Sequence, residues 1–185
     1  MDPFNQPNVT EAKDRTNALL ATWEKSGALP ASQPAVTTDA LEIYSTSKAT
    51  SVADQLKEFL TGDAHYFATM AYLHRGADDA ITQLRELVAT ISGKASTFGW
   101  GPRFLHSTGQ FHKGGQLNGA FIQVTGDNAQ DLAIPGRDFT FHTLLMAQAL
   151  GDGEALTSRD LPLLRIHLKK RSEGIAEILT ALRSL

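Results

Sequence analysis

The part of this sequence best equipped for chemistry runs from residue 93 to residue 119. It contains seven glycines, two lysines, two histidines and one arginine, and no acidic residue occurs between Glu86 and Asp127. Glycine lets backbone N–H groups come close to an anion, and lysine or arginine adds charge-assisted hydrogen bonds. These residue types predict a phosphate or other anion site in a loop, and the candidate binding residues are Arg103, His106, Ser107, Thr108, Gln110, His112, Lys113, Gly114 and Gly115.

The spacing of these residues leaves a second interpretation open. It matches neither the Walker A loop nor the dinucleotide-binding fingerprint. In the second interpretation, residues 93–119 form a long ordered surface loop whose glycines serve turns. We expect neither a metal nor a cofactor, because His106 and His112 are six residues apart and no Cys, Asp or Glu lies nearby to complete a ligand set.

Two further groups of polar residues have an ordinary and a functional interpretation. Arg165 and His167 share one face of a predicted strand, which either meets solvent or faces the glycine-rich stretch. Lys13 falls in a predicted helix, where the residue pattern alone indicates a solvated lysine.

The elements that must position these residues alternate between strand and helix. Asn8, followed three residues later by Glu11, indicates a helix N-cap, and Gly27 a helix end. We therefore divide the chain into an N-terminal helix (1–27), a proline-containing linker (28–39) and an α/β domain (40–185). Within that domain, residue patterns predict strands at 41–45, 66–73, 96–100, 120–125 and 163–168, and helices at 51–61, 78–91, 140–150 and 172–184. This order favours an α/β fold with a mixed or mostly parallel sheet of four to five strands, flanked by helices and preceded by the N-terminal helix.

The composition excludes several classes of protein. The 185 residues carry a formal net charge of −3, which argues against general nucleic-acid binding. Cysteine is absent, so disulfide scaffolds and thiolate metal sites are excluded. No apolar run is long enough to span a membrane, and the N-terminus lacks the pattern of a secretory signal. We expect a cytoplasmic protein with no membrane partner.

Two segments resemble a known family. Pro3-Phe4-Asn5-Gln6-Pro7-Asn8-Val9, followed by Lys13, resembles the C-terminal active-site motif of glucose-6-phosphate isomerase, in which a Pro-Phe-Asp-Gln-Pro-Gly-Val segment precedes a lysine helix. The lysine keeps its register, while Asn5 and Asn8 replace the aspartate and glycine. The resemblance implies that Lys13 is a catalytic residue that contacts the sugar near its ring oxygen and assists ring opening.

The second resemblance covers most of the remaining chain. The segment from Gly101 to Gly115 is similar to a signature of fused transaldolase/glucose-6-phosphate isomerase proteins, and the likeness continues at 131–136, 147–152 and 164–168. In those proteins an extra region follows the lysine helix. Here 172 residues follow Lys13, and Gln116 stands where the family usually has proline.

The resemblance implies a partial enzyme. Isomerisation between an aldose and a ketose needs a base that moves a proton between C1 and C2, and the family's base glutamate lies upstream of the motif. We therefore expect the C-terminal part of a bifunctional enzyme, inactive alone, whose partners are a sugar phosphate and the upstream isomerase and transaldolase domains.

Two other roles stay open. The chain is alternatively a structural or interaction module that holds the fusion together or forms a homodimer. It also fits a domain that completes the isomerase site of the whole protein, with His106 or His112 acting on substrate. We further expect the apolar stripe of the first helix, which includes Trp23, either to dock on residues 40–185 or to drive self-association.

Overall fold

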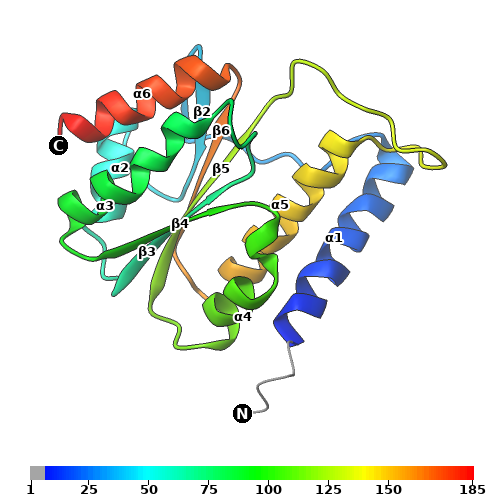
Figure 1. Cartoon of the computed structure of the whole chain (residues 1–185), viewed down its shortest axis with the longest axis horizontal. Helices are drawn as coiled ribbons and strands as arrows, with labels where there is room; N and C mark the ends of the chain where they lie inside the picture. Colours follow the sequence, from blue (N-terminus) through cyan, green and yellow to red (C-terminus); the bar gives the residue numbers. More distant parts are fainter. Residues whose placement is uncertain (1–6) are drawn as a thin grey trace.

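The structure, a computed structural model, describes residues 7–185 and has three layers (Figure 1). A six-stranded sheet lies between two groups of helices. One face is covered by α2 (Val52–Leu60), α3 (Leu84–Ser92) and α6 (Arg171–Arg183). The other face carries α1 (Pro7–Ser26), α4 (Ser107–Gly114) and α5 (Phe141–Thr157). Within residues 7–185, every helix is too short or too polar to span a lipid bilayer.

The sheet confirms the predicted α/β class. Its strands are β1 (Val36–Thr37), β2 (Leu41–Tyr44), β3 (Tyr66–Ala71), β4 (Ala95–Trp100), β5 (Gly119–Gly126) and β6 (Leu163–Leu168). They lie in the order β1-β2-β6-β5-β3-β4. The pairs β3–β4, β3–β5 and β5–β6 are parallel, whereas β2 runs antiparallel to β6 and to β1. The sixth strand is β1, a two-residue strand inside the predicted linker that hydrophobic patterning did not indicate.

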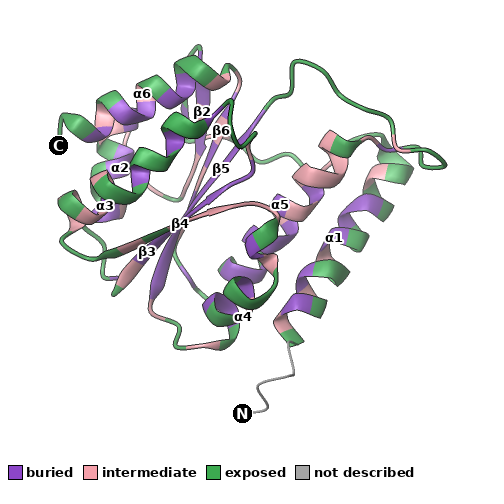
Figure 2. Cartoon of the chain, in the orientation of Figure 1, coloured by how far each residue is buried: buried purple, intermediate pink, exposed green. Residues whose placement is uncertain are grey.

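The two faces of the central strands differ in chemistry. On β5, Ala120, Ile122 and Val124 join the main core, which α2, α3 and α6 cover. The alternate residues Phe121, Gln123 and Thr125 are equally buried on the opposite face, under α5 (Figure 2). The second face therefore buries polar side chains in the middle of the sheet, and those groups need partners.

The glycine-rich stretch is not a loop. Residues 93–119 contain β4, the 3₁₀ turn η2 (Arg103–Leu105) and α4. On α4 the buried residues are Gly109, His112 and Lys113, which follow the i, i+3, i+4 spacing of a helix face. Hydrophobic periodicity does not indicate this helix, because its buried face consists of glycine, histidine and lysine.

Two other boundaries differ from the predicted ones. The helix expected at 78–91 begins as the 3₁₀ turn η1 (Asp79–Gln83) before α3. Helix α5 continues seven residues past residue 150, through Gly151 and Gly153. A Cβ at Gly151 would lie 3.1 Å from the backbone nitrogen of Thr16 on α1. Glycine at this position lets α1 and α5 approach closely rather than ending the helix.

The first helix docks on the domain, which is the first of the two alternatives left open by its apolar stripe. Its residues Leu19 and Leu20 pack with Phe139 and with Ala147 of α5. The rings of Trp23 and Phe139 meet edge to face, 6.3 Å apart. The apolar stripe of α1 is therefore covered by the chain itself.

Polar contacts fix the other end of α1. The helix begins at Pro7, so Asn8 lies in the first turn rather than at the predicted N-cap. The backbone N–H of Asn8 donates to Gln110 Oε1 (3.0 Å), and Gln110 Nε2 donates to Asn8 Oδ1 (2.7 Å). Glu11 accepts from Arg15 and, at 2.5 Å, from Arg159, which lies two residues beyond the end of α5. These contacts join α1 to α4 and to α5.

The hydrogen bonds that Glu11 accepts from Arg15 and Arg159 give a pH-dependent contribution to the free energy of unfolding. The hydrogen bond from Arg159 is the main cause that lowers the pKa of Glu11 from 4.5 to about 2. Because the folded pKa is lowered, the contribution is complete above pH 4.5 and disappears as the pH falls through 2. We expect Glu11→Gln to lower the free energy of unfolding at pH 7, and the gap from the wild type to close between pH 4.5 and pH 2. Urea unfolding at several pH values measures this gap, and a gap independent of pH would contradict it.

Candidate functional site

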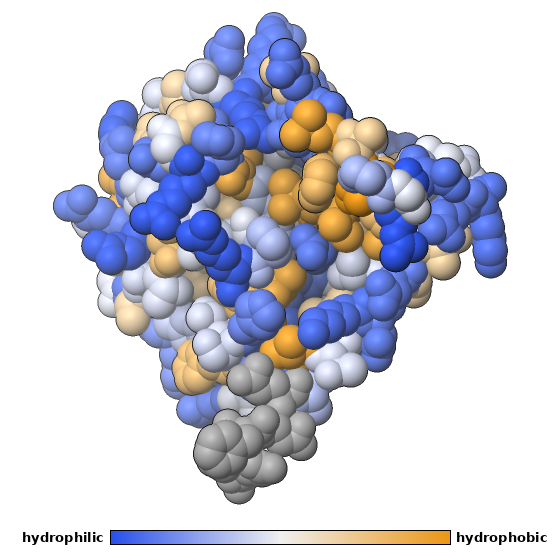
Figure 3. All heavy atoms as spheres, turned by 45° about the vertical axis from the view of Figure 1, so that its right-hand side comes forward, coloured by the Kyte–Doolittle hydropathy of each residue, from blue (hydrophilic) through white to orange (hydrophobic). Residues whose placement is uncertain are grey.

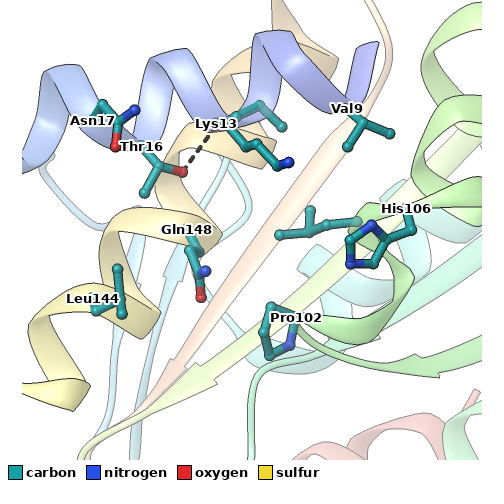
Figure 4. A pocket seen from close by; sticks show the side chains of 10 residues that line it. Val9, Lys13, Thr16, Asn17, Pro102, His106, Leu144 and Gln148 are labelled. Atoms are coloured by element: carbon teal, nitrogen blue, oxygen red, sulfur yellow. Dashed lines mark hydrogen bonds between the residues drawn. The ribbon is translucent and has the colours of Figure 1, made fainter. Parts of the chain in front are cut away.

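A cavity lies where α1, the η2–α4 segment and α5 meet (Figure 4). It has a volume of about 290 Å³ and is lined by Val9, Ala12, Lys13, Thr16, Asn17, Pro102, Leu105, His106, Leu144 and Gln148. The face of the molecule turned forward in Figure 3 is hollowed near its centre, with hydrophobic side chains inside the hollow and hydrophilic ones around it. The cavity thus combines an apolar floor with a few polar side chains, as small-molecule sites do.

The cavity brings together residues from two distant parts of the sequence. Lys13 projects from the exposed side of α1, and His106 stands immediately before α4. Both side chains point toward the space between them (Figure 4). The hydrogen bonds between Asn8 and Gln110 hold the two elements that carry these residues in register.

The electrostatic character of the cavity suits an anion. None of its ten lining residues is acidic, and within residues 7–185 no carboxylate lies within 4.0 Å of the Lys13 ammonium group. Asn17 and Gln148 add amide groups that can donate to or accept from hydroxyls. A ligand that carries both a phosphate and several hydroxyls matches this set of groups.

Other candidate residues lie near the cavity but do not line it. Arg103, Ser107 and Thr108 are exposed on η2 and the start of α4. Gln110 is engaged by Asn8, and its amide also lies against Gly114. At Gly115 a Cβ would lie 2.5 Å from the carbonyl oxygen of Phe111, so this glycine serves backbone packing.

His112 is directed into the protein, away from the cavity. Its Nδ1 is 2.8 Å from the hydroxyl of Tyr66, and its ring stacks on the Tyr66 ring and meets Phe121 edge to face. Burial, together with the charge of Lys113, lowers the pKa of His112 from 6.5 to about 4. The ring is therefore neutral at pH 7, and its contacts favour a packing role over anion binding.

Lys113 is likewise turned inward. Its side chain is fully buried, and its ammonium nitrogen lies 2.5 Å from Oδ1 of Asp152 on α5. Burial raises the pKa of Asp152, while the Lys113 charge acts in the opposite direction. A lysine already paired in the interior is not available to a ligand, and its position favours a structural role.

Several residues that line the cavity were not predicted as site residues. Nothing in the local sequence pattern separates them from ordinary helix positions; they are Thr16, Asn17, Leu144 and Gln148. Gln148 lies in the 147–152 segment that resembles the fused enzymes, and this resemblance is the one sequence feature that could have pointed to it. Arg165 and His167 are half-buried, and they line a cavity together with residues of α5 and residues 29–32 rather than with the 93–119 segment.

The fold and the cavity define a three-layer α/β protein with an acid-free cavity between its N-terminal helix and α5. No protein-family model matches the sequence, and no curated protein matches it. The structure is similar to the crystal structure of hypothetical protein TT0462 from Thermus thermophilus, with a TM-score of 0.55 and 17% sequence identity. The likeness covers 71% of this chain and 35% of that one, so the matched part spans about a third of the length of TT0462. At this identity the likeness concerns the fold alone.

Proposed function

We propose that this chain is the C-terminal part of a glucose-6-phosphate isomerase of the fused transaldolase type, and that the Lys13 cavity binds the sugar phosphate. One observation carries the proposal. Lys13, from the first family-like motif, and His106, from the second, line a single acid-free cavity. Residues from two separate segments, each of which resembles a motif of this family, thus lie at one cavity whose groups suit a sugar phosphate.

The groups in the cavity suit one part of the isomerase reaction. The Lys13 ammonium group can neutralise the phosphate or stabilise negative charge at the ring oxygen as the sugar ring opens. His106 can exchange a proton with a sugar hydroxyl, and Asn17 and Gln148 can orient the remaining hydroxyls. Moving a proton between C1 and C2 needs a base, and none of the ten described residues that line the cavity carries a carboxylate for that step. We therefore assign substrate binding and ring opening to this chain, and the proton transfer to the rest of a cytoplasmic enzyme.

Titration calorimetry with glucose 6-phosphate and fructose 6-phosphate at low salt tests this proposal. We expect saturable binding that Lys13→Ala weakens at least tenfold, since a charge-assisted hydrogen bond contributes about 1.5–3 kcal/mol. Lys25→Ala is the matched control, because Lys25 lies in the last turn of the same helix and does not line the cavity. Equal loss in both variants, or none in Lys13→Ala, would contradict the assignment.

An interaction module is the second candidate function. Phe111 and Leu117 flank the end of α4 and are 61% and 52% exposed. Exposed apolar side chains of this size are typical of contact surfaces. A stable dimer in light scattering, together with no sugar-phosphate binding, would favour this role over the first.

A further inference from the structure

A second group of polar residues lies on the sheet face under α5, away from Lys13. Neighbouring strands place Tyr44 beside Arg165, and Arg165 beside Gln123, in register. The segment 29–32 and α5 cover this row from above. Arg165 thus occupies the middle of a polar row that crosses β2, β6 and β5.

The neighbours of Arg165 have hydrogen-bond partners. His167 Nδ1 lies 2.9 Å from the Thr125 hydroxyl, and its Nε2 lies 3.1 Å from Asp127 Oδ1. The Tyr44 hydroxyl donates to Glu42 at 2.5 Å. These groups form the walls of the site and keep the Glu42 carboxylate occupied.

Arg165 and Gln123, in contrast, have polar atoms without hydrogen-bond partners. Within residues 7–185, the guanidinium group of Arg165 makes no hydrogen bond or ion pair and only stacks on the Tyr44 ring, 4.0 Å from its centre. Gln123 is fully buried, its Nε2 donates to the carbonyl of Ala149, and its Oε1 lacks a partner among the described residues. Most buried polar atoms in proteins have a hydrogen-bond partner, and a ligand that reaches Gln123 Oε1 would supply the missing one.

Two adjoining cavities lie beside these groups: Arg165 lines both, and Gln123 lines the smaller one. One has a volume of about 340 Å³ and is lined by Arg165, His142 and Trp23 among others. The second, of about 170 Å³, is lined by Arg165 and Gln123. The two share Arg165, Ser32, Pro30 and Leu150. Each cavity has one acidic residue in its lining. Glu42 lines the larger cavity and accepts a hydrogen bond from the Tyr44 hydroxyl, and Glu154 lines the smaller one, with Arg15 3.9 Å away.

We propose that these cavities form a second ligand site, for a small organic anion whose carboxylate or phosphate binds Arg165 and whose hydroxyl or amino group donates to Gln123 Oε1. The planar guanidinium group favours a two-point bond to such an anion, and Tyr44 fixes its plane from behind. Trp23, Met146 and Leu150 supply an apolar wall for the body of the ligand.

This site is separate from the Lys13 cavity. The two share no lining residue, and α5 runs between them, with Leu144 and Gln148 on one side and Met146 and Leu150 on the other. The inference therefore holds or fails independently of the proposed isomerase function.

Trp23 provides a direct readout of occupancy. The chain has two tryptophans, so Trp100→Phe leaves Trp23, which lines the larger cavity, as the reporter. The probes are glycerate for the carboxylate, glycerol 3-phosphate for the phosphate and glycerol as the neutral control. We expect saturable fluorescence changes with at least one of the two anions and none with glycerol. Whichever anion binds more tightly identifies the charged group that the site prefers.

Three variants in this background locate the binding. Arg165→Gln should weaken it at least tenfold, and Ser32→Phe should weaken it by filling the cavity from the exposed segment without disturbing the core. Lys13→Ala should leave it unchanged within twofold. No fluorescence change at about 10 mM of either anion, a range that would fill even a weak site, would overturn the proposal. Binding that survives both Arg165→Gln and Ser32→Phe, or that Lys13→Ala removes, would overturn it as well.

Discussion

Replacing Asp152 by alanine is expected to lower the free energy of unfolding by about 3–5 kcal/mol, because it leaves the Lys113 ammonium group charged and unpaired in the interior. The Lys113 side chain is fully buried and that of Asp152 is 2% exposed, so water cannot take the place of the lost partner. A domain of this size has a total stability of about 5–15 kcal/mol, so this single change removes a large part of it.

Urea unfolding followed by circular dichroism measures the loss, and a double variant identifies its cause. We expect Lys113→Met combined with Asp152→Leu to recover most of the stability, since apolar residues of similar volume can replace a buried ion pair. If Asp152→Ala unfolds at the same urea concentration as the wild type, the pair is not buried as described. If the double variant is no more stable than Asp152→Ala, the unpaired Lys113 is not the cause of the loss.

The buried Lys113–Asp152 pair also decides which lysine is suitable for mutation in a binding experiment. From the sequence, Lys113 is a natural choice for mutation at an anion site. From the structure, Lys113→Ala would leave the buried Asp152 carboxyl group without its partner and would destabilise the domain, so weaker binding in this variant would not show contact with the ligand. Lys13, exposed on α1, is free of this difficulty.

The second large effect concerns the aromatic cluster beneath α4. Phe121 is fully buried, with the Tyr66 ring at 6.1 Å and the His112 ring at 5.0 Å, both edge to face. We expect Phe121→Ala to lower the free energy of unfolding by about 3–5 kcal/mol, through lost burial and the cavity left behind. Thermal and urea unfolding both measure this change.

Phe111→Ala is the matched control for Phe121→Ala. Phe111 belongs to the same aromatic group but is 61% exposed, so its removal should alter the free energy of unfolding by less than about 0.5 kcal/mol. Similar losses in the two variants would mean that the cluster is not organised around Phe121.

The fold was predictable where hydrophobic patterns are strong. Alternation at 163–168 correctly placed Leu164, Ile166 and Leu168 in the core, and the pattern at 120–125 correctly separated the two faces of β5. Helix α4 was not predictable, because a face of Gly109, His112 and Lys113 carries no hydrophobic signal. The extension of α5 was missed because Gly151 and Gly153 resemble a helix end, although Gly151 serves packing against α1.

The candidate site was predictable only in part. Residue types alone favoured a solvated role for Lys13, and the family resemblance singled it out; its meeting with His106 required the docking of α1. His112 and Lys113 are buried, and this burial favours packing over ligand binding for both. It could not be predicted from the sequence, because the buried face of α4 carries no apolar pattern. Arg165 could be assigned to a strand face, but the segment that covers it is an irregular chain without a pattern.

The most direct test of the central claim is an NMR titration of the ¹⁵N-labelled chain with glucose 6-phosphate. We expect saturable shifts in the amides of residues 9–17, 103–106 and 144–148, which surround the Lys13 cavity, and their loss in Lys13→Ala. No shift with millimolar ligand, or shifts elsewhere that persist in Lys13→Ala, would contradict the claim that this cavity binds the sugar phosphate.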